Sequence, residues 1–331
     1  MKFLKTTNHN TPSNSINLGL VGLLTTTMLG FSGMAAAGES VDELKNADNI
    51  KHVQIENKRG DINVIGWEQA EIKVAGELDD KAERLIFERS GNSFKIKVVI
   101  PHQHGNSWNE QGSQLTINVP QGVSIDFNGV SSDFSIKNTE GSAEINTVSG
   151  NINANGLTDN VQIYTVSGEI TNQNASGKIA LSSVSGDIDD KASSGRLKVK
   201  SVSGNLKTSS SAQEVLVNTV SGDAEVSLKA VDELNISTVS GDVEAKLHLN
   251  DNGLIKVSSV SGDYLLAMQD DVNATFRLGS SAGGDFINKI TNDKPTKAKY
   301  GPSSKLTFET GNGSASVRGT TVSGRIKVTT H

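Results

Sequence analysis

The sequence predicts an all-β protein whose body is a parallel β-solenoid, a β-helix-like stack of coils of about 18 residues capped by an N-terminal β module. Three observations predict this fold. Val-Ser-Gly followed by an acidic residue or Asn occurs seven times, its glycine recurs at nearly constant spacing, and Val, Ile and Leu recur in register with it. The glycine position falls at 132 (a serine), 150, 168, 186, 204, 222, 241, 262 and 284, so five intervals of 18 residues precede intervals of 19, 21 and 22.

The coil around Gly168 shows how the pattern predicts a strand and a corner. From Val161 to Thr165, Val, Ile and Thr alternate with Gln and Tyr, as in a strand with one buried face. Val166 breaks this alternation, so we place a corner there. Glycine suits the corner because it lacks a Cβ and tolerates positive φ. Beyond the corner we expect Val166 and Ile170 to point inward.

Equivalent positions of successive coils should stack as ladders of similar side chains. Parallel strands of successive coils would lie about 4.8 Å apart. A coil of only 18 residues encloses a thin interior, which the side chains fill without leaving an internal ligand cavity. The position seven before each glycine predicts an inward ladder of Ile125, Ala143, Val161, Ile179, Leu197, Val215, Leu234 and Ile255. The position two after it predicts a second ladder of Phe134, Ile152, Ile170, Ile188, Leu206, Ala224, Val243, Tyr264 and Phe286. The serine before each glycine predicts an outward hydroxyl row of Ser149, Ser167, Ser185, Ser203, Ser221, Ser240 and Ser261.

Changes in the repeat divide the chain into four segments. We expect a signal peptide over 1–37, an N-terminal β module or cap over 38–119, solenoid repeats over 120–290 and a C-terminal β cap over 291–331. Residues 53–62 match the coil template, but the strands expected between 71 and 119 lose the period. After a Pro-containing break the template returns at 306–315 and 321–326, which we expect to close the C-terminal end. Caps at both ends would cover open strand edges.

The first 37 residues have the organisation of a secretory signal peptide. Lys2 and Lys5 precede an apolar stretch over 16–31, and Ala35 to Ala37 provide an A-x-A cleavage site. The rival interpretation is an uncleaved anchor, but the apolar core is short for a membrane span. We therefore predict an exported protein, periplasmic or at the cell surface, with no transmembrane span in the mature chain.

Composition excludes several classes of function. The formal net charge of −6 makes nucleic acid and anionic lipid surfaces poor partners. The absence of cysteine removes disulfides, thiol catalysis, cysteine zinc sites and the acylated cysteine of a lipoprotein.

Three features of the chain resemble a known family. An opening strand leads to Gly60-Asp61-Ile62 and Trp67, a Val-Pro-x-Gly-Val step spans 119–123, and Thr-Val-Ser-Gly-Asp-Ile repeats follow. Over about residues 50 to 328 the chain is similar to the putative-adhesin family of β-strand-repeat domains, formerly domains of unknown function. The resemblance implies a β-solenoid, an envelope or surface location and, in some relatives, envelope-stress sensing. It brings no catalytic residue.

A row of carboxylates is the best candidate site. Positions one and three after the glycine should both point outward, where stacked acids could hold Ca²⁺ or a cationic partner. We favour the alternative of ordinary Gly-Asp turn chemistry with solvated acids, because surface charge rarely marks a site. No other cofactor or metal is predicted. The candidate residues are Asp187, Asp189, Asp223, Glu225, Asp242, Glu244 and Asp263.

Two short motifs have simpler explanations. His102 and His104 could bind a metal from one side of a strand, but their Pro/Gly/Asn-rich surroundings favour an exposed loop. Arg59-Gly60-Asp61 matches the integrin-binding tripeptide, yet it occupies the Gly-Asp corner of the repeat itself.

The sequence predicts no enzyme. A lyase site on a β-helix needs an acidic metal cluster beside a basic residue, and no outward row before the corner brings the two together. Trp67 and Trp108 lie outside the repeats, so the repeats lack an aromatic platform for sugars. We expect an adhesin-like binding or structural role at the cell envelope, with an envelope or host glycan, or an envelope protein, as partner. A periplasmic envelope-stress or signalling component is the first alternative, and a carbohydrate-active β-helix enzyme is the second.

Overall fold

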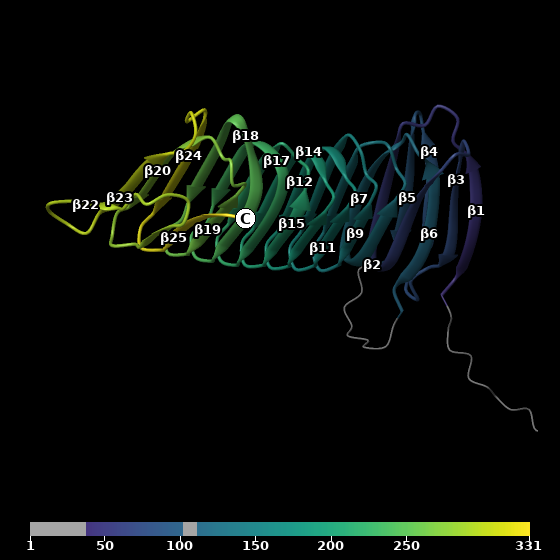
Figure 1. Ribbon diagram of the computed structural model, residues 1–331. Coiled ribbons are helices and arrows are strands. Elements are labelled where there is room, and N and C mark those ends of the chain that lie inside the picture. Colours follow the sequence, from purple (N-terminus) through teal and green to yellow (C-terminus); the bar gives the residue numbers. More distant parts are fainter. Residues whose placement is uncertain (1–37, 102–110) are drawn as a thin grey trace, which may run out of the picture. The chain divides into compact units, whose positions relative to one another are not determined.

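The computed structural model describes residues 38–101 and 111–331, and these described residues belong to one compact unit (Figure 1). Within the described ranges the chain forms 25 strands and no helix, so the prediction of an all-β solenoid is confirmed. The predicted signal peptide over 1–37, the two histidines of the His102 motif and Trp108 lie outside the described residues. No helix with the length and hydropathy to cross a membrane occurs in 38–101 or 111–331.

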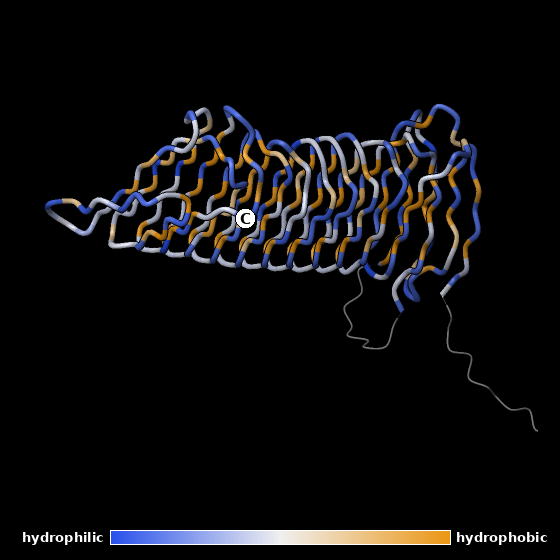
Figure 2. Tube along the Cα trace, in the orientation of Figure 1, coloured by the Kyte–Doolittle hydropathy of each residue, from blue (hydrophilic) through white to orange (hydrophobic). Residues whose placement is uncertain are grey.

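The strands alternate buried and exposed residues. Hydrophobic and hydrophilic residues likewise alternate along the coils (Figure 2). The first half of the chain contributes β1 (Ser40–Asn46), β2 (His52–Trp67), β3 (Glu71–Glu77), β4 (Arg84–Ser90), β5 (Ser93–Val99), β6 (Ser113–Pro120), β7 (Ser124–Lys137), β8 (Ala143–Thr147), β9 (Ile152–Asn155), β10 (Asn160–Thr165), β11 (Ile170–Gln173) and β12 (Ser176–Ser183). The second half contributes β13 (Ile188–Lys191), β14 (Ser194–Ser201), β15 (Leu206–Ser210), β16 (Glu214–Thr219), β17 (Ala224–Ser237), β18 (Val243–Ser258), β19 (Tyr264–Met268), β20 (Ala274–Ser280), β21 (Phe286–Asn288), β22 (Thr296–Lys297), β23 (Ser304–Glu309), β24 (Ala315–Thr321) and β25 (Ile326–Thr330).

Each coil has one strand before its Val-Ser-Gly corner and one after it, and both pair in parallel with the next coil. Before the corner, β8, β10, β12, β14 and β16 stack without a register shift. After the corner, β9, β11, β13 and β15 do the same. The two predicted inward ladders are confirmed over this range, since their members are cross-strand partners and are buried. The predicted outward serine row is also exposed.

The sequence pattern predicted that the corner valine points inward, and this prediction is wrong. Val148, Val202 and Val220 are 44–46% exposed, and Val166 is half-buried. The residue before each of them already fills the interior: Thr165 is buried, and its Oγ1 accepts a hydrogen bond from the Gly168 N–H at 3.0 Å. The corner therefore turns the valine out to solvent.

The corner glycines are required by close approach more than by backbone conformation. A Cβ on Gly168 would lie 1.8 Å from the carbonyl oxygen of Gly150 in the preceding coil. The expectation of positive φ holds at Gly222 and Gly241, with φ of 145° and 152°, but Gly168 is outside that region. Stacking at strand spacing leaves no room for a side chain at this point.

At the N-terminal end, β2 is itself a coil of the solenoid. It pairs in parallel with β7, with Val53 opposite Ile125 and Ile62 opposite Phe134, and on its other side with β5 and β6. Antiparallel strands then cover the edge: β4 lies on β5, and β3 and β1 follow β6. The match of residues 53–62 to the coil template is thus confirmed.

At the C-terminal end, the last coil lies inside the stack and does not close it. β24 lies in parallel between β18 and β20, and β25 lies between β19 and β21. We call β24–β25 (Ala315–Thr330) the intercalated coil. The inward ladder consequently runs from Tyr264 to Ile326 and only then to Phe286, which corrects the order expected from the sequence. β23 and β22 cover the outer edge in antiparallel orientation.

Tyr264 is the largest side chain buried against the intercalated coil. Its side chain is buried, and its Oη has no hydrogen-bond partner among the described residues. Burial raises the pKa of this phenol. Tyr264 fits because Gly319 lies opposite, where a Cβ would be 2.1 Å from Oη.

We expect Tyr264→Phe to stabilise the protein by about 1 kcal/mol, because it removes a buried hydroxyl that has lost its water without gaining a partner. Urea unfolding of the two proteins measures the difference. A loss of stability in the variant would show that Oη has a partner.

Candidate functional site

The predicted acidic ladder forms two parallel rows after the corner, one at the residue directly after the glycine and one inside the strand that follows. The acids directly after the glycine use one oxygen for the fold: Asp223 Oδ1 accepts the backbone N–H of Asp242 at 2.9 Å, and Asp242 Oδ1 accepts that of Asp263 at 2.9 Å. Asn205 Oδ1 accepts the Asp223 N–H at 3.1 Å in the same way. Because the amide of Asn205 accepts the same hydrogen bond as the carboxylates, the main role of this row is to link neighbouring coils.

The acids three residues after the glycine are partly neutralised by lysine. Lys191 Nζ bonds Asp189, and Lys207 Nζ lies 2.7 Å from Glu225 Oε2 in the next coil. The hydrogen bond to Glu225 raises the pKa of Lys207. Both pairs are solvent-exposed, so each contributes little to stability.

Five of the seven predicted acids line one groove of about 350 Å³. Asp187 and Asp189 are outside it, because the coil of Asn205 and Lys207 lies between. The groove is completed by Arg325 and Lys327, which the sequence order did not place here because they belong to the intercalated coil. Among residues 38–101 and 111–331, no three His, Asp or Glu side chains are arranged to hold a metal ion. The acids in the groove are Asp223, Glu225, Asp242, Glu244 and Asp263.

A second groove, of about 360 Å³, lies on the same side of the corner over the first coils. Five polar residues that are direct cross-strand neighbours line it, one each from β6, β2, β7, β9 and β11. A neighbouring row adds Lys137, Asn155 and Gln173. We call it the amide groove; its central row is Thr116, Asn63, Ser135, Asn153 and Thr171.

The side chains of this central row are uncommitted. None of the five makes a side-chain hydrogen bond to another described residue, whereas Asp223 and Asp242 on the same side of the corner are used by the fold. Asn63 and Asn153 are exposed and the other three are half-buried. The row therefore presents amide and hydroxyl groups at strand spacing, about 4.8 Å, which a polar ligand can bond directly.

The sequence reasoning missed a buried carboxyl. Asp190 is fully buried in the solenoid interior, where it accepts hydrogen bonds from Asn172 Nδ2 at 2.6 Å, Ser193 Oγ and Thr208 Oγ1 at 2.8 Å. Desolvation raises the pKa of Asp190, the three hydrogen bonds oppose that shift, and the charge of Asp189 adds to it. The signal in the sequence was its position: Asp190 lies two residues after the inward Ile188, so the alternation of the strand places this acid inward.

Asp190 should make stability depend on pH. Because its pKa is higher in the folded chain than in the unfolded chain, the folded state holds the proton more tightly, and its contribution is complete only below the ordinary carboxyl pKa of about 3.9. The free energy of unfolding should fall as pH rises through the folded-state pKa. We expect Asp190→Asn to lose this dependence and to be more stable than the wild type at pH 8, with a gap that narrows toward pH 4. Urea unfolding across this range measures it, and parallel curves would contradict the assignment.

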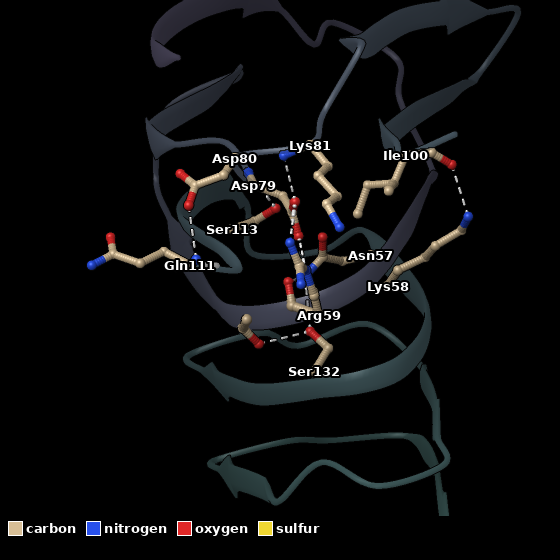
Figure 3. Close-up of polar contacts among 11 residues, drawn as sticks. Asn57, Lys58, Arg59, Asp79, Asp80, Lys81, Ile100, Gln111, Ser113 and Ser132 are labelled. Atoms are coloured by element: carbon tan, nitrogen blue, oxygen red, sulfur yellow. Dashed lines mark hydrogen bonds and ion pairs between the residues drawn. The ribbon is translucent and has the colours of Figure 1, made fainter. Parts of the chain in front are cut away.

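Arg59 of the Arg-Gly-Asp tripeptide is held by the fold (Figure 3). Its Nε and Nη2 both bond the carboxylate of Asp79, the latter at 2.8 Å, and the Asp79 side chain is completely buried. Asp79 Oδ1 also accepts the Lys81 N–H at 2.8 Å. An arginine engaged in this way does not present an integrin-type motif, which supports the view that the tripeptide is part of the repeat.

A protein-family profile matches residues 50–329, which is most of the chain and all of the stacked coils. The chain belongs to the Toastrack DUF4097 family. The Toastrack match spans the N-terminal strands, the Val-Ser-Gly coils and the intercalated coil alike. None of the curated proteins compared with this Toastrack protein matches it.

Three solved structures are similar to the Toastrack chain at low identity. A putative cell adhesion protein from Clostridium sporogenes is 10% identical over 88% of this chain and 100% of its own, with a TM-score of 0.24. A putative adhesin from Bacteroides fragilis is 12% identical over 88% and 98%, with a TM-score of 0.39. A putative adhesin from Parabacteroides distasonis is 11% identical over 89% and 98%, with a TM-score of 0.40. At these scores the similarities support no inference about function.

Proposed function

We propose that this protein is an exported, non-catalytic, adhesin-like binding protein of the cell envelope that holds a glycan in the amide groove. The observation that carries the proposal is the uncommitted row of amides and hydroxyls across five adjacent strands. Sugar hydroxyls both donate and accept hydrogen bonds, and amide side chains offer both functions at one position. Such a row binds a polymer at several points, each of modest strength.

The same groove argues against catalysis. Its lining contains no Asp, Glu or His, and Lys137 is its one ionisable side chain. General acid–base cleavage of a glycosidic bond requires a positioned pair of titratable groups, which this surface does not offer. Binding without turnover is the chemistry that this lining supports.

Incubation of the purified protein with a panel of envelope and host polysaccharides tests the proposal. We expect retention of at least one neutral polysaccharide without soluble products, and its loss on substitution of Asn153→Ala together with Thr171→Val. Asn235→Ala, on an outward position of β17 away from the groove, is the matched control. Soluble products would overturn the non-catalytic role, and absence of retention would overturn glycan binding.

Export is tested separately. Mass spectrometry of the protein recovered from the cell envelope should show an N-terminus directly after Ala37. A protein that keeps residues 1–37 would contradict cleavage and support the anchor.

A further inference from the structure

The corner valines form a continuous stripe along the solenoid, which we call the valine ridge. The serine N–H of one coil donates to the valine carbonyl of the coil before it, for example Ser167 to Val148 at 2.9 Å and Ser221 to Val202 at 2.8 Å. The ladder passes through the intercalated coil, where Ser323 N bonds Val260 O at 3.1 Å. The ridge consists of Val130, Val148, Val166, Val184, Val202, Val220, Val239, Val260 and Val322.

Most of the ridge is exposed, and only Val166 and Val184 are half-buried. Seven of its valines are 40–49% exposed, and they are most of the large hydrophobic residues exposed among residues 38–101 and 111–331. At strand spacing, nine coils extend the ridge over about 38 Å. Contiguous apolar stripes on soluble proteins usually mark a contact surface.

The backbone alone does not explain the choice of valine. A β-branched residue suits the extended corner, but threonine is also β-branched and would be better solvated. The chain uses Thr or Ser at the adjacent inward position, as at Thr165, Ser183 and Thr219, and Val at the exposed one. Meanwhile the buried ladders vary among Ile, Val, Leu, Ala, Phe and Tyr. The exposed corner position is valine in nine stacked coils and alanine, Ala282, in the coil of Gly284, while the core varies more widely, which points to a surface role.

The charged border of the ridge defines the partner. Three residues after each valine lies a row that is mostly acidic, with Arg325 as its basic member and Asn151 and Asn205 as its neutral ones. Two residues before each valine the row is uncharged except for Lys200. The acids of the border are Asp133, Glu169, Asp187, Asp223, Asp242 and Asp263.

Other occupants fit this border poorly. A second copy would bring another acidic row on a chain of net charge −6, and an anionic lipid surface would be repelled. Strand addition is not available, because the corner carbonyls already accept hydrogen bonds from the next coil. An apolar segment flanked by Lys or Arg satisfies both the ridge and its border.

We propose that the valine ridge docks a protein segment that carries apolar side chains flanked by basic ones, in a contact independent of the amide groove. The valines supply burial, and the acidic row supplies orientation and attraction. At two border positions the natural residue is Asn, and its Oδ1 still accepts the backbone N–H of the next coil. The charge of a border acid can therefore be removed without losing this hydrogen bond.

The test measures binding of the full protein to two designed helical peptides, one with a leucine face and a lysine face and one with glutamate in place of lysine. The lysine peptide should bind and the glutamate peptide should not. A triple variant, Val202→Thr, Val220→Thr and Val239→Thr, should weaken binding about tenfold. Each half-exposed valine contributes only part of the free energy of burying a whole valine side chain. Asp223→Asn with Asp242→Asn should weaken binding about threefold and flatten its salt dependence.

Two controls separate the proposal from general stickiness. Asp232→Asn with Asp251→Asn removes the same charge away from the ridge and should leave binding unchanged. Thermal unfolding should confirm that the threonine variants remain folded. The proposal fails if the lysine peptide does not bind, if the threonine variant binds as well as the wild type, or if the glutamate peptide binds equally. It also fails if the wild type forms a dimer that the threonine variant abolishes, since a second copy would then cover the ridge.

Discussion

Cysteines introduced at positions 265 and 327 should form a disulfide, whereas cysteines at 265 and 287 should not. Leu265 and Lys327 are cross-strand partners in adjacent parallel strands, and Lys327 separates Leu265 from Ile287. Adjacent strands place Cα atoms about 5 Å apart, within the range of a disulfide, while two strand spacings of about 9.6 Å exceed it. The chain has no native cysteine to compete.

The experiment compares three double variants, Leu265→Cys with Lys327→Cys, Ile287→Cys with Lys327→Cys, and Leu265→Cys with Ile287→Cys. Peptide mapping under non-reducing conditions should find the first two bridged and the third reduced. The opposite pattern, a bridge between 265 and 287 alone, would mean that the coils stack in chain order and that the intercalated coil lies at the end.

Gly168→Ala should destabilise the protein by about 3 kcal/mol, the upper range for an overpacked site. The new Cβ would meet the Gly150 carbonyl oxygen at 1.8 Å, and that oxygen belongs to backbone that is itself fixed by stacking on the next coil. Relief requires the two coils to separate at the corner, which weakens the hydrogen-bond ladder on both sides. Unfolding in urea measures the loss.

Gly279→Ala is the matched control. Gly279 lies in β20, and a Cβ there has nothing within 4 Å. We expect this variant to be neutral or slightly stabilising, because alanine restricts the unfolded chain. Equal losses at both positions would show that the corner glycines serve backbone flexibility and not close approach.

Much of the fold was predictable because it repeats. A strict period of side chains two residues apart identifies strands, and copying one coil along an axis fixes which residues meet, as the pairing of Val161 with Ile179 and of Ile170 with Ile188 confirms. The outward serines and the outward acids follow from the same alternation. These features are local: each depends on a coil and its immediate neighbour.

The direction of the corner valines was not predictable in this way. Val166 follows the inward Thr165, and a parity change between adjacent residues is equally consistent with a turn that buries the valine or one that exposes it. The decision rests on the Thr165 Oγ1 bond to the Gly168 N–H, which folds the corner around the hydroxyl and leaves the valine outside. Alternation of hydrophobicity carries no information about such a bond.

Of the candidate site, the residue types came from the sequence and their grouping came from the fold. The acids were identified as one ladder, but the coil of Asn205 and Lys207 divides it, and Arg325 and Lys327 join the groove from a coil distant in the chain. The free side chains of Asn63 and Asn153 belong to the same row only because β2 stacks directly on β7, which places Ser135 between them.

Sequence periodicity alone therefore determines the all-β solenoid, its coil length and the two faces of each strand, because these arise from alternation and repetition along the chain. The order of the coils at both ends, the exposed valine ridge and the buried Asp190 cluster were decided by tertiary structure. Parallel strands of similar pattern can pair in several orders, and the choice among them depends on which edges become covered and which buried polar groups find partners.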